Sequence, residues 1–119
     1  MAISTDCEEI TINFHEASDF FAVQADFTSS EAESQIQRAI EKVEAIIRND
    51  LICQSFLGND ERKQSFFVPQ DQECRPTDFA ALGGHLKRIE WTSWDGSADR
   101  GRDVTEADQT EWRKWATAP

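Results

Sequence analysis

The stretch DGSADRGRDVTE, residues 95–106, has acidic or hydroxyl side chains at its positions 1, 3, 5, 9 and 12, close to the spacing of a calcium-binding loop. The oxygen-bearing side chains at these positions are Asp95, Ser97, Asp99, Asp103 and Glu106. The stretch departs from the calcium pattern because Arg100 stands where the sharp turn needs glycine, and Arg102 replaces an apolar anchor. Two cations inside the loop would also repel a metal ion. We therefore predict a polar turn in which Thr105 caps a following helix, with no bound metal.

The other residue types that carry chemistry lack the spacing of a known site. The zinc-binding and nucleophilic candidates are Cys7, Cys53, Cys74, His15 and His85. They form no close ligand pair, and three dispersed cysteines suggest neither a zinc site nor a disulfide framework. The glycines of ALGGH close a predicted helix, whereas a phosphate loop opens one. We expect no cofactor, and Cys53 is interpreted as a small core residue. A small enzyme with His15 or His85 in a pocket between helix and sheet stays an alternative.

All four tryptophans lie in the last third of the chain, at positions 91, 94, 112 and 115, and basic residues stand beside them. Such a set could form a stacking platform for single-stranded nucleic acid. The net charge of -11 opposes direct binding to a polyanion. We therefore interpret Trp112 and Trp115 as the residues that dock a terminal helix. Trp91 and Trp94 are interpreted as anchors in a protein interface.

The first part of the chain is purely anionic, because no lysine or arginine precedes Arg38. A surface of this kind steers a protein onto a basic partner, although a merely solvated face would have the same composition. We predict that the acidic residues bind a basic protein, itself a nucleic-acid-binding one in the sharpest form of the hypothesis. The predicted partner-binding residues are Glu8, Glu9, Glu16, Asp19, Asp26, Glu31 and Glu33, with Trp91 and Trp94 as apolar anchors.

The pattern of apolar residues places these side chains on a hairpin and a long helix. Ile10, Ile12 and Phe14 alternate with polar residues, and a second alternating run spans 19–27, which predicts two antiparallel strands. A helix is predicted over about 30–49, with Ser30 and Glu33 as its capping box. Its apolar stripe consists of Ile36, Ala39, Ile40, Val43, Ile46 and Ile47, and we expect the stripe to pack on the hairpin.

The rest of the chain predicts a second hairpin, an edge strand and a short C-terminal helix. LICQSFL and QSFFV, at 51–57 and 64–68, read as paired strands, and residues 69–76 as a loop. A helical turn is expected at 77–84 and a strand at 85–94. The expected fold is therefore α+β, with one antiparallel sheet built from two hairpins plus an edge strand and the long helix on one face. We expect residues 1–119 to form a single compact domain.

The composition is that of a small soluble protein, with 119 residues of which 39% are hydrophobic. No apolar run is long enough for a membrane helix, and the first ten residues lack the pattern of a secretory leader, so we expect a cytoplasmic protein without membrane contact. The composition is similar to that of bacterial immunity proteins and phage-encoded inhibitors, some of which mimic the charge of nucleic acid. The leading hypothesis is a protein that occludes a basic partner. A further alternative is a phage or assembly component that self-associates, with its acidic end against the tryptophan- and arginine-rich end of a neighbouring copy. A homodimer is a separate alternative for its oligomeric state.

Overall fold

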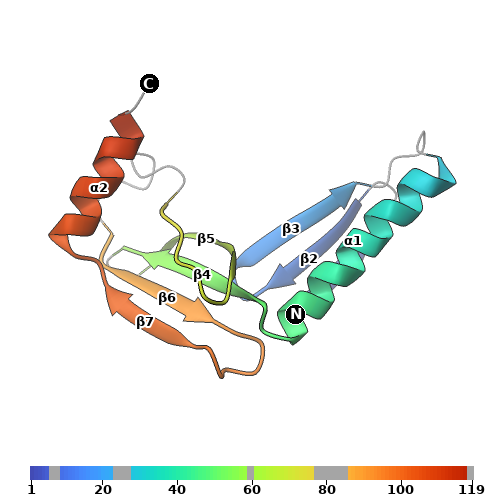
Figure 1. Cartoon of the computed structure of the whole chain (residues 1–119), viewed down its shortest axis with the longest axis horizontal. Helices are drawn as coiled ribbons and strands as arrows, with labels where there is room; N and C mark the ends of the chain where they lie inside the picture. The colour runs from blue at the N-terminus through green and yellow to red at the C-terminus, as the bar shows by residue number, and fades with distance from the viewer. Residues whose placement is uncertain (6–8, 23–27, 59–60, 77–85, 118–119) are drawn as a thin grey trace.

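The computed structural model describes residues 1–5, 9–22, 28–58, 61–76 and 86–117. These ranges contain seven strands and two helices, and the predicted α+β class is confirmed (Figure 1). In chain order they are β1 (Ala2–Thr5), β2 (Glu9–Phe14), β3 (Ala17–Ala22), α1 (Ser29–Ile47), β4 (Leu51–Leu57), β5 (Arg62–Pro69), β6 (Arg88–Thr92), β7 (Arg100–Asp103) and α2 (Glu106–Thr117). The strands form two antiparallel sheets, in the orders β1-β2-β3 and β5-β4-β6-β7, so the two predicted hairpins belong to separate sheets and not to one sheet as expected.

The first sheet and α1 together form what we call the N-terminal layer. The predicted hairpin is present as β2 and β3, which turn at His15 and Glu16, with His15 in the left-handed region at φ 55°. β1 pairs antiparallel with β2, so that Ile3 lies opposite Ile12. This strand was not predicted. Only four residues long, AIST has too few positions to display a clear period of two.

Helix α1 covers one face of that sheet. Its N-cap is Thr28, whose hydroxyl accepts a hydrogen bond from the Glu31 amide, while the Glu31 carboxylate accepts one from the Thr28 amide. The capping box therefore lies two residues earlier than the predicted Ser30 and Glu33. Both pairs have the same sequence pattern, and the structure places the first helical residue at Ser29.

The apolar stripe of α1 packs on the sheet along only one of its flanks. Ala39 and Ile46 are buried, and Val43 is half-buried. Along the other flank the exposed fractions are 43% for Ile36, 46% for Ile40 and 50% for Ile47. The expectation that the whole stripe packs on the hairpin is therefore wrong for this outer flank, because α1 packs mainly on β2, β3 and β4 and leaves a gap between Ile36, Ile40 and the β1 side of the sheet.

The second sheet and α2 form the C-terminal layer. The predicted hairpin of β4 and β5 is confirmed, and residues 70–76 leave it as a loop. The strand expected at the sheet edge is present as β6, but it lies between β4 and β7, so the prediction that it forms the edge is wrong. The residues of β7 read RGRD and were interpreted as loop because they show no apolar alternation. Trp112 of α2 is buried against the Phe56 ring, with 5.7 Å between the ring centroids.

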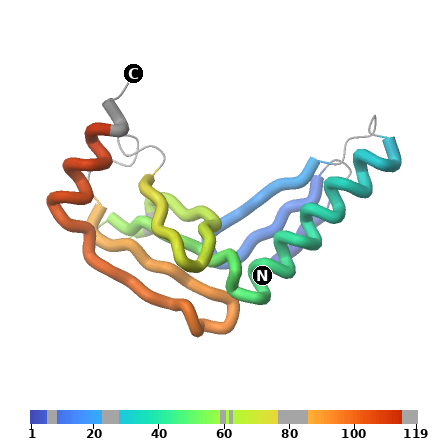
Figure 2. The backbone as a smooth tube through the Cα atoms, in the orientation of Figure 1, coloured from blue at the N-terminus to red at the C-terminus, as the bar shows by residue number. Residues whose placement is uncertain are grey.

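Strand β4 contributes to both hydrophobic cores and so connects the two layers. Ile52 and Phe56 belong to the core of the C-terminal layer, whereas Cys53 belongs to that of the N-terminal layer, as alternation along a strand requires. The prediction that Cys53 is a core residue is confirmed, since it is fully buried. Figure 2 shows the layers as two limbs that open from this strand, and the radius of gyration is 16.5 Å, against about 13.5 Å for a compact chain of this length.

Several sequence expectations fall outside the described residues. They concern the strand positions 23–27 and the helical turn at 77–84. The expectation of a single domain over 1–119 stays a prediction. Neither α1 nor the described part of α2 offers an apolar stretch that would reach across a bilayer.

Candidate partner-binding surface

An apolar groove of about 300 Å³ lies between α1 and the β1–β2 side of the first sheet. Residues from three elements line it: Ile3 and Thr5 of β1, Ile10 and Ile12 of β2, and Ile36, Ala39, Ile40, Val43 and Glu44 of α1. We call this feature the isoleucine groove. Ile3 is 56% exposed, and Ile36 and Ile40 face it from the outer flank of the helix. Complete burial of an isoleucine is favourable by about 1.5–3 kcal/mol, so covering these half-exposed side chains would contribute about 1 kcal/mol each.

The groove borders an open edge of the sheet. β1 is the outermost strand of its sheet, and among the described residues it has no neighbour on its outer side. All four of its residues are exposed. In an antiparallel ladder, alternate backbone groups point to opposite sides of a strand, so half of those in β1 point away from β2. An edge of this kind can accept another strand.

The charges on α1 are arranged unevenly about the groove. Glu33, Ile36, Ile40, Glu44 and Ile47 follow each other at spacings of three and four residues, so they form one stripe along the helix, here called the outer stripe. The cations Arg38 and Lys42 lie on the opposite flank, where they line a hollow with Asp19 and Phe21 of β3. Glu44 is contacted by Arg48, at 3.4 Å, in a pair whose two side chains are more than half exposed. Such an exposed pair stabilises little. The outer stripe therefore carries two carboxylates, Glu33 and Glu44, with one cation beside Glu44.

The predicted acidic residues do not form one continuous surface. Glu31 lies in the first turn of α1 and Glu33 in the turn that follows, toward the far tip of the layer, where α1 begins (Figure 1). Glu9 is the first residue of β2. Glu16 lies at the inner end, in the turn between β2 and β3. The Asp19 carboxylate contacts the Lys42 ammonium at 2.8 Å. Glu8 and Asp26 lie outside the described residues.

The premise of a cation-free anionic surface therefore needs correction. Sequence order separated the acidic segment from Arg38 and all later cations, but α1 folds back along the hairpin and brings Lys42 onto Asp19. The register also puts Asp19 on the helix-facing side of β3, opposite Ile12, whereas Glu9 alternates to the other side of β2. What the outer stripe does present is Glu33 and Glu44, one on either side of the exposed Ile36 and Ile40.

The two predicted tryptophan anchors have different surroundings. Trp91 is only 4% exposed, its indole N–H donates to Gln54 Oε1 at 3.2 Å, and the Arg100 guanidinium lies 4.5 Å from its ring centroid. It is therefore a core residue and cannot anchor a partner. Trp94 is 44% exposed and packs on Phe14 of β2, with 6.0 Å between centroids. It lies at the junction of the layers and does not line the isoleucine groove.

Burial also argues against the nucleic-acid platform. Trp91 and Trp112 are both buried, so their faces are not available for stacking on bases. The side chain of Trp115 lies outside the part of the chain that the structure describes.

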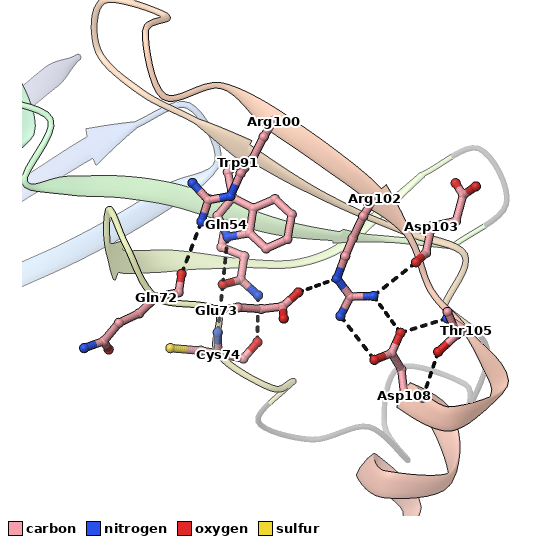
Figure 3. A network of polar contacts seen from close by, with 10 residues as sticks. All are labelled: Gln54, Gln72, Glu73, Cys74, Trp91, Arg100, Arg102, Asp103, Thr105 and Asp108. Atoms are coloured by element: carbon pink, nitrogen blue, oxygen red, sulfur yellow. Dashed lines mark hydrogen bonds and ion pairs between the residues drawn. The ribbon is translucent and has the colours of Figure 1, made fainter.

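A polar network around Gln54 holds the loop of residues 70–76 against the second sheet (Figure 3). Gln54 is fully buried; its Nε2 donates to the Cys74 carbonyl at 2.7 Å, and its Oε1 accepts from the Cys74 amide at 3.0 Å. Arg100 donates to the Gln70 carbonyl at 3.1 Å. Within the described residues, no buried side-chain nitrogen or oxygen lacks a hydrogen-bond partner. The network therefore has a structural role, which is to hold the loop against the sheet.

Arg102 extends the network to α2. Its Nε contacts Glu73 Oε1 at 2.6 Å, and its terminal nitrogens donate to both oxygens of Asp108, at 2.7 and 3.2 Å (Figure 3). The hydrogen bonds from Arg102 lower the pKa of Asp108 to about 2, and the same bonds raise the pKa of Arg102 above its usual value. Asp108 also accepts from the Thr105 amide, and the Thr105 hydroxyl accepts from the Asp108 amide. The prediction that Thr105 caps the last helix is confirmed.

Most oxygen-bearing side chains of the calcium-like stretch make hydrogen bonds or ion pairs with other groups of the protein. Asp95 accepts from the Ser97 amide, and hydrogen bonds from Ser97 lower the pKa of Asp95. Asp99 accepts from both the amide and the hydroxyl of Ser93. Asp103 is in β7 and pairs with Arg88, while Glu106 begins α2. Among the described residues, no three histidine, cysteine, aspartate or glutamate side chains are grouped so as to hold a metal ion.

The enzyme alternative receives no geometric support. His15 is exposed in the hairpin turn and does not line the groove between helix and sheet. His85 lies outside the described residues. The groove is lined almost entirely by apolar side chains, whereas a catalytic pocket combines apolar walls with convergent polar groups.

The groove itself was not predicted from the sequence. Ile36 and Ile40 were assigned to the core because they share the periodic spacing of Ala39 and Ile46. One signal was present: Glu33 and Glu44 continue the spacing of Ile36 and Ile40, so the outer stripe mixes acids with isoleucines where a fully buried face would not.

No protein-family model matches the sequence, and neither the curated proteins nor the solved structures gave a significant match.

Proposed function

We propose that this chain is a cytoplasmic binding protein that occludes a basic partner protein through the isoleucine groove and its acidic flank. The observation that carries the proposal is the exposure of Ile3, Ile36 and Ile40 on one groove, beside Glu33 and Glu44, in a chain with a net charge of -11. Apolar surface supplies the affinity of a protein interface, and the surrounding charge selects the partner and speeds encounter.

The sign of the charge favours a basic protein over nucleic acid or an acidic surface. The chain has 23 acidic and 12 basic side chains, so its field repels polyanions and attracts cations. The two cations within α1, Arg38 and Lys42, lie on the other flank of the helix, whereas Arg48 at its C-cap contacts Glu44. A partner that handles nucleic acid has the required basic surface, and an inhibitor of such a protein is the most specific form of this proposal.

The test is affinity capture with groove variants. Three forms of the protein are immobilised: wild type, the double variant Ile36→Gln/Ile40→Gln, and Ile47→Gln. Each is exposed to proteins of the native host at about 0.1 M and at about 1 M salt. The Debye length falls from about 10 Å to about 3 Å between these concentrations. Ile47 is the matched control, because it is equally exposed on the same helix but does not line the groove. We expect a basic protein to be captured at low salt by wild type and Ile47→Gln, and lost with the double variant.

Capture that the double variant retains would contradict the proposal, as would a partner held equally at both salt concentrations. The unfolding free energy of each variant is measured by urea titration as a folding control. Since both substituted positions are nearly half exposed, we expect the double variant to stay within about 1 kcal/mol of wild type.

A further inference from the structure

We infer that the partner occupies the groove by adding a β-strand to the free edge of β1, with alternate apolar side chains beneath Ile36 and Ile40 of α1 and with lysine or arginine among the remaining residues. This inference rests on the proposed function and specifies the partner segment. It combines two independent features, the open backbone edge and the apolar groove directly beside it.

The first argument for strand addition comes from the backbone of β1. β1 has exposed side chains at all four positions and ends the sheet order β1-β2-β3. Long or flat open edges are usually blocked by charged residues, proline or a bulge. Ala2, Ile3, Ser4 and Thr5 include none of these, and their pairing with β2 is regular. The edge is therefore suited to accept hydrogen bonds from an extended segment, the mode known as strand addition.

The second argument for strand addition comes from the side chains that line the isoleucine groove. Successive residues of a strand point to opposite faces of its sheet, and on β1 the residues that face α1 are Ile3 and Thr5. An added strand would continue this surface and place every second side chain next to Ile3, under Ile36 and Ile40. Apolar residues at those positions would cover the exposed parts of all three isoleucines. A helix laid in the groove would satisfy the side chains but leave the β1 edge unpaired.

The charges decide between a partner segment and a second copy of this chain. In a symmetric pair of β1 strands, the two copies of α1 would approach along their outer stripes, which carry Glu33 and Glu44. Like charges brought together in this way oppose association. A segment with lysine or arginine would instead meet carboxylates of opposite sign. The acidic flank therefore favours a basic strand from another protein.

The test uses peptides of about eight residues, long enough for one strand. The parent peptide alternates valine and lysine, and a second replaces each lysine with glutamate. Two further peptides carry N-methyl groups, one at every valine and the other at every lysine. Because the amides of alternate residues point to opposite edges of a strand, only one of these two removes the N–H groups that would face β1. Binding is measured by fluorescence anisotropy and by amide shifts of the protein, at low salt.

We expect the valine–lysine peptide to bind and to shift the amides of β1, and the glutamate peptide to bind about tenfold or more weakly. One of the two N-methylated peptides should lose about tenfold in affinity, while the other keeps the parent value. Ile36→Gln/Ile40→Gln should weaken binding, whereas Ile47→Gln should not. If both N-methylated peptides bind as the parent does, strand addition is wrong even though the groove can still be the partner site.

Three other outcomes would also overturn the inference. One is equal binding of the lysine and glutamate peptides, which would contradict the selection of a basic segment by the acidic side chains of α1. Another is the absence of binding by every peptide at about 1 mM, the weakest affinity of practical interest. The third is a concentration-dependent dimer, seen by sedimentation, that the double variant dissociates, because a second copy would then occupy the edge. Failure of the proposed function is distinct, since it would appear as capture from the host that ignores the groove variants.

Discussion

In the C-terminal layer, buried polar groups and apolar rings are fully engaged with one another. Gln54 satisfies the Cys74 backbone and the Trp91 indole, and Arg102 joins the 70–76 loop to α2. In the N-terminal layer, by contrast, a regular helix lies on a sheet and leaves three isoleucines on the groove about half exposed. Both layers have the same ingredients, a sheet and a helix. The difference is that the C-terminal layer is closed by its own residues, whereas the N-terminal layer leaves apolar surface exposed, which is where we propose that a partner binds.

The largest effect on stability is expected at Gln54, where a substitution tests whether the C-terminal layer is held together by its own contacts. Gln54→Ala would leave the Cys74 amide and carbonyl and the Trp91 N–H without partners, and would open a cavity at a fully buried position. We expect a loss of about 3–5 kcal/mol in the free energy of unfolding, measured by urea titration. Gln70→Ala, at an exposed position of the same loop, should change it by less than about 0.5 kcal/mol. A loss below about 1 kcal/mol at Gln54 would show that the network does not hold the loop.

The next effect separates the two flanks of α1. Ile46→Ala removes a fully buried side chain and should cost about 2–5 kcal/mol. Ile40→Ala is the same change at another position of the same helix. It should lower the free energy of unfolding by less than about 1 kcal/mol, because Ile40 is already nearly half exposed and alanine favours helices. Thermal and urea unfolding of the two variants measure the difference. Equal losses would mean that the groove is closed in solution.

A smaller effect concerns Asp108 and pH. Its pKa in the folded protein is about 2, against the usual 3.8, because Arg102 donates hydrogen bonds to its carboxylate. A carboxyl group whose pKa is lowered by folding stabilises the protein above the unfolded value, and this stabilisation is lost as pH falls from about 4 towards 2. Arg102 is 35% exposed, so screening limits the contribution to about 1–2 kcal/mol.

Asp108→Asn should therefore lower the unfolding free energy by about 1–2 kcal/mol at pH 7, and the difference from wild type should shrink as pH approaches 2. Urea titrations at several pH values between these limits measure the profile. Glu106→Gln, which removes a carboxylate from the same helical turn, serves as the control at pH 7. A difference between Asp108→Asn and wild type that does not change with pH would contradict the assignment of the stabilisation to this carboxylate.

Periodicity in the sequence was sufficient to predict the α+β class, the two hairpins and both helices. The missing elements were the short strands β1 and β7, whose residues AIST and RGRD carry no alternating signal. The prediction of burial on α1 was only half correct, because a helix pattern shows which residues share a face but not over which strands the helix lies. The position of Lys42 beside Asp19 could not be read from the sequence for a related reason. That contact depends on how the helix lies across the hairpin.

The central claim is that the partner lies on the N-terminal layer, and hydrogen–deuterium exchange on the captured complex tests it most directly. The amides of β1 and the α1 segment 36–47 should exchange more slowly in the complex than in the free protein. Those of β6, β7 and α2 should be unchanged. Protection confined to the C-terminal layer, with β1 and α1 exchanging as they do in the free chain, would contradict the account.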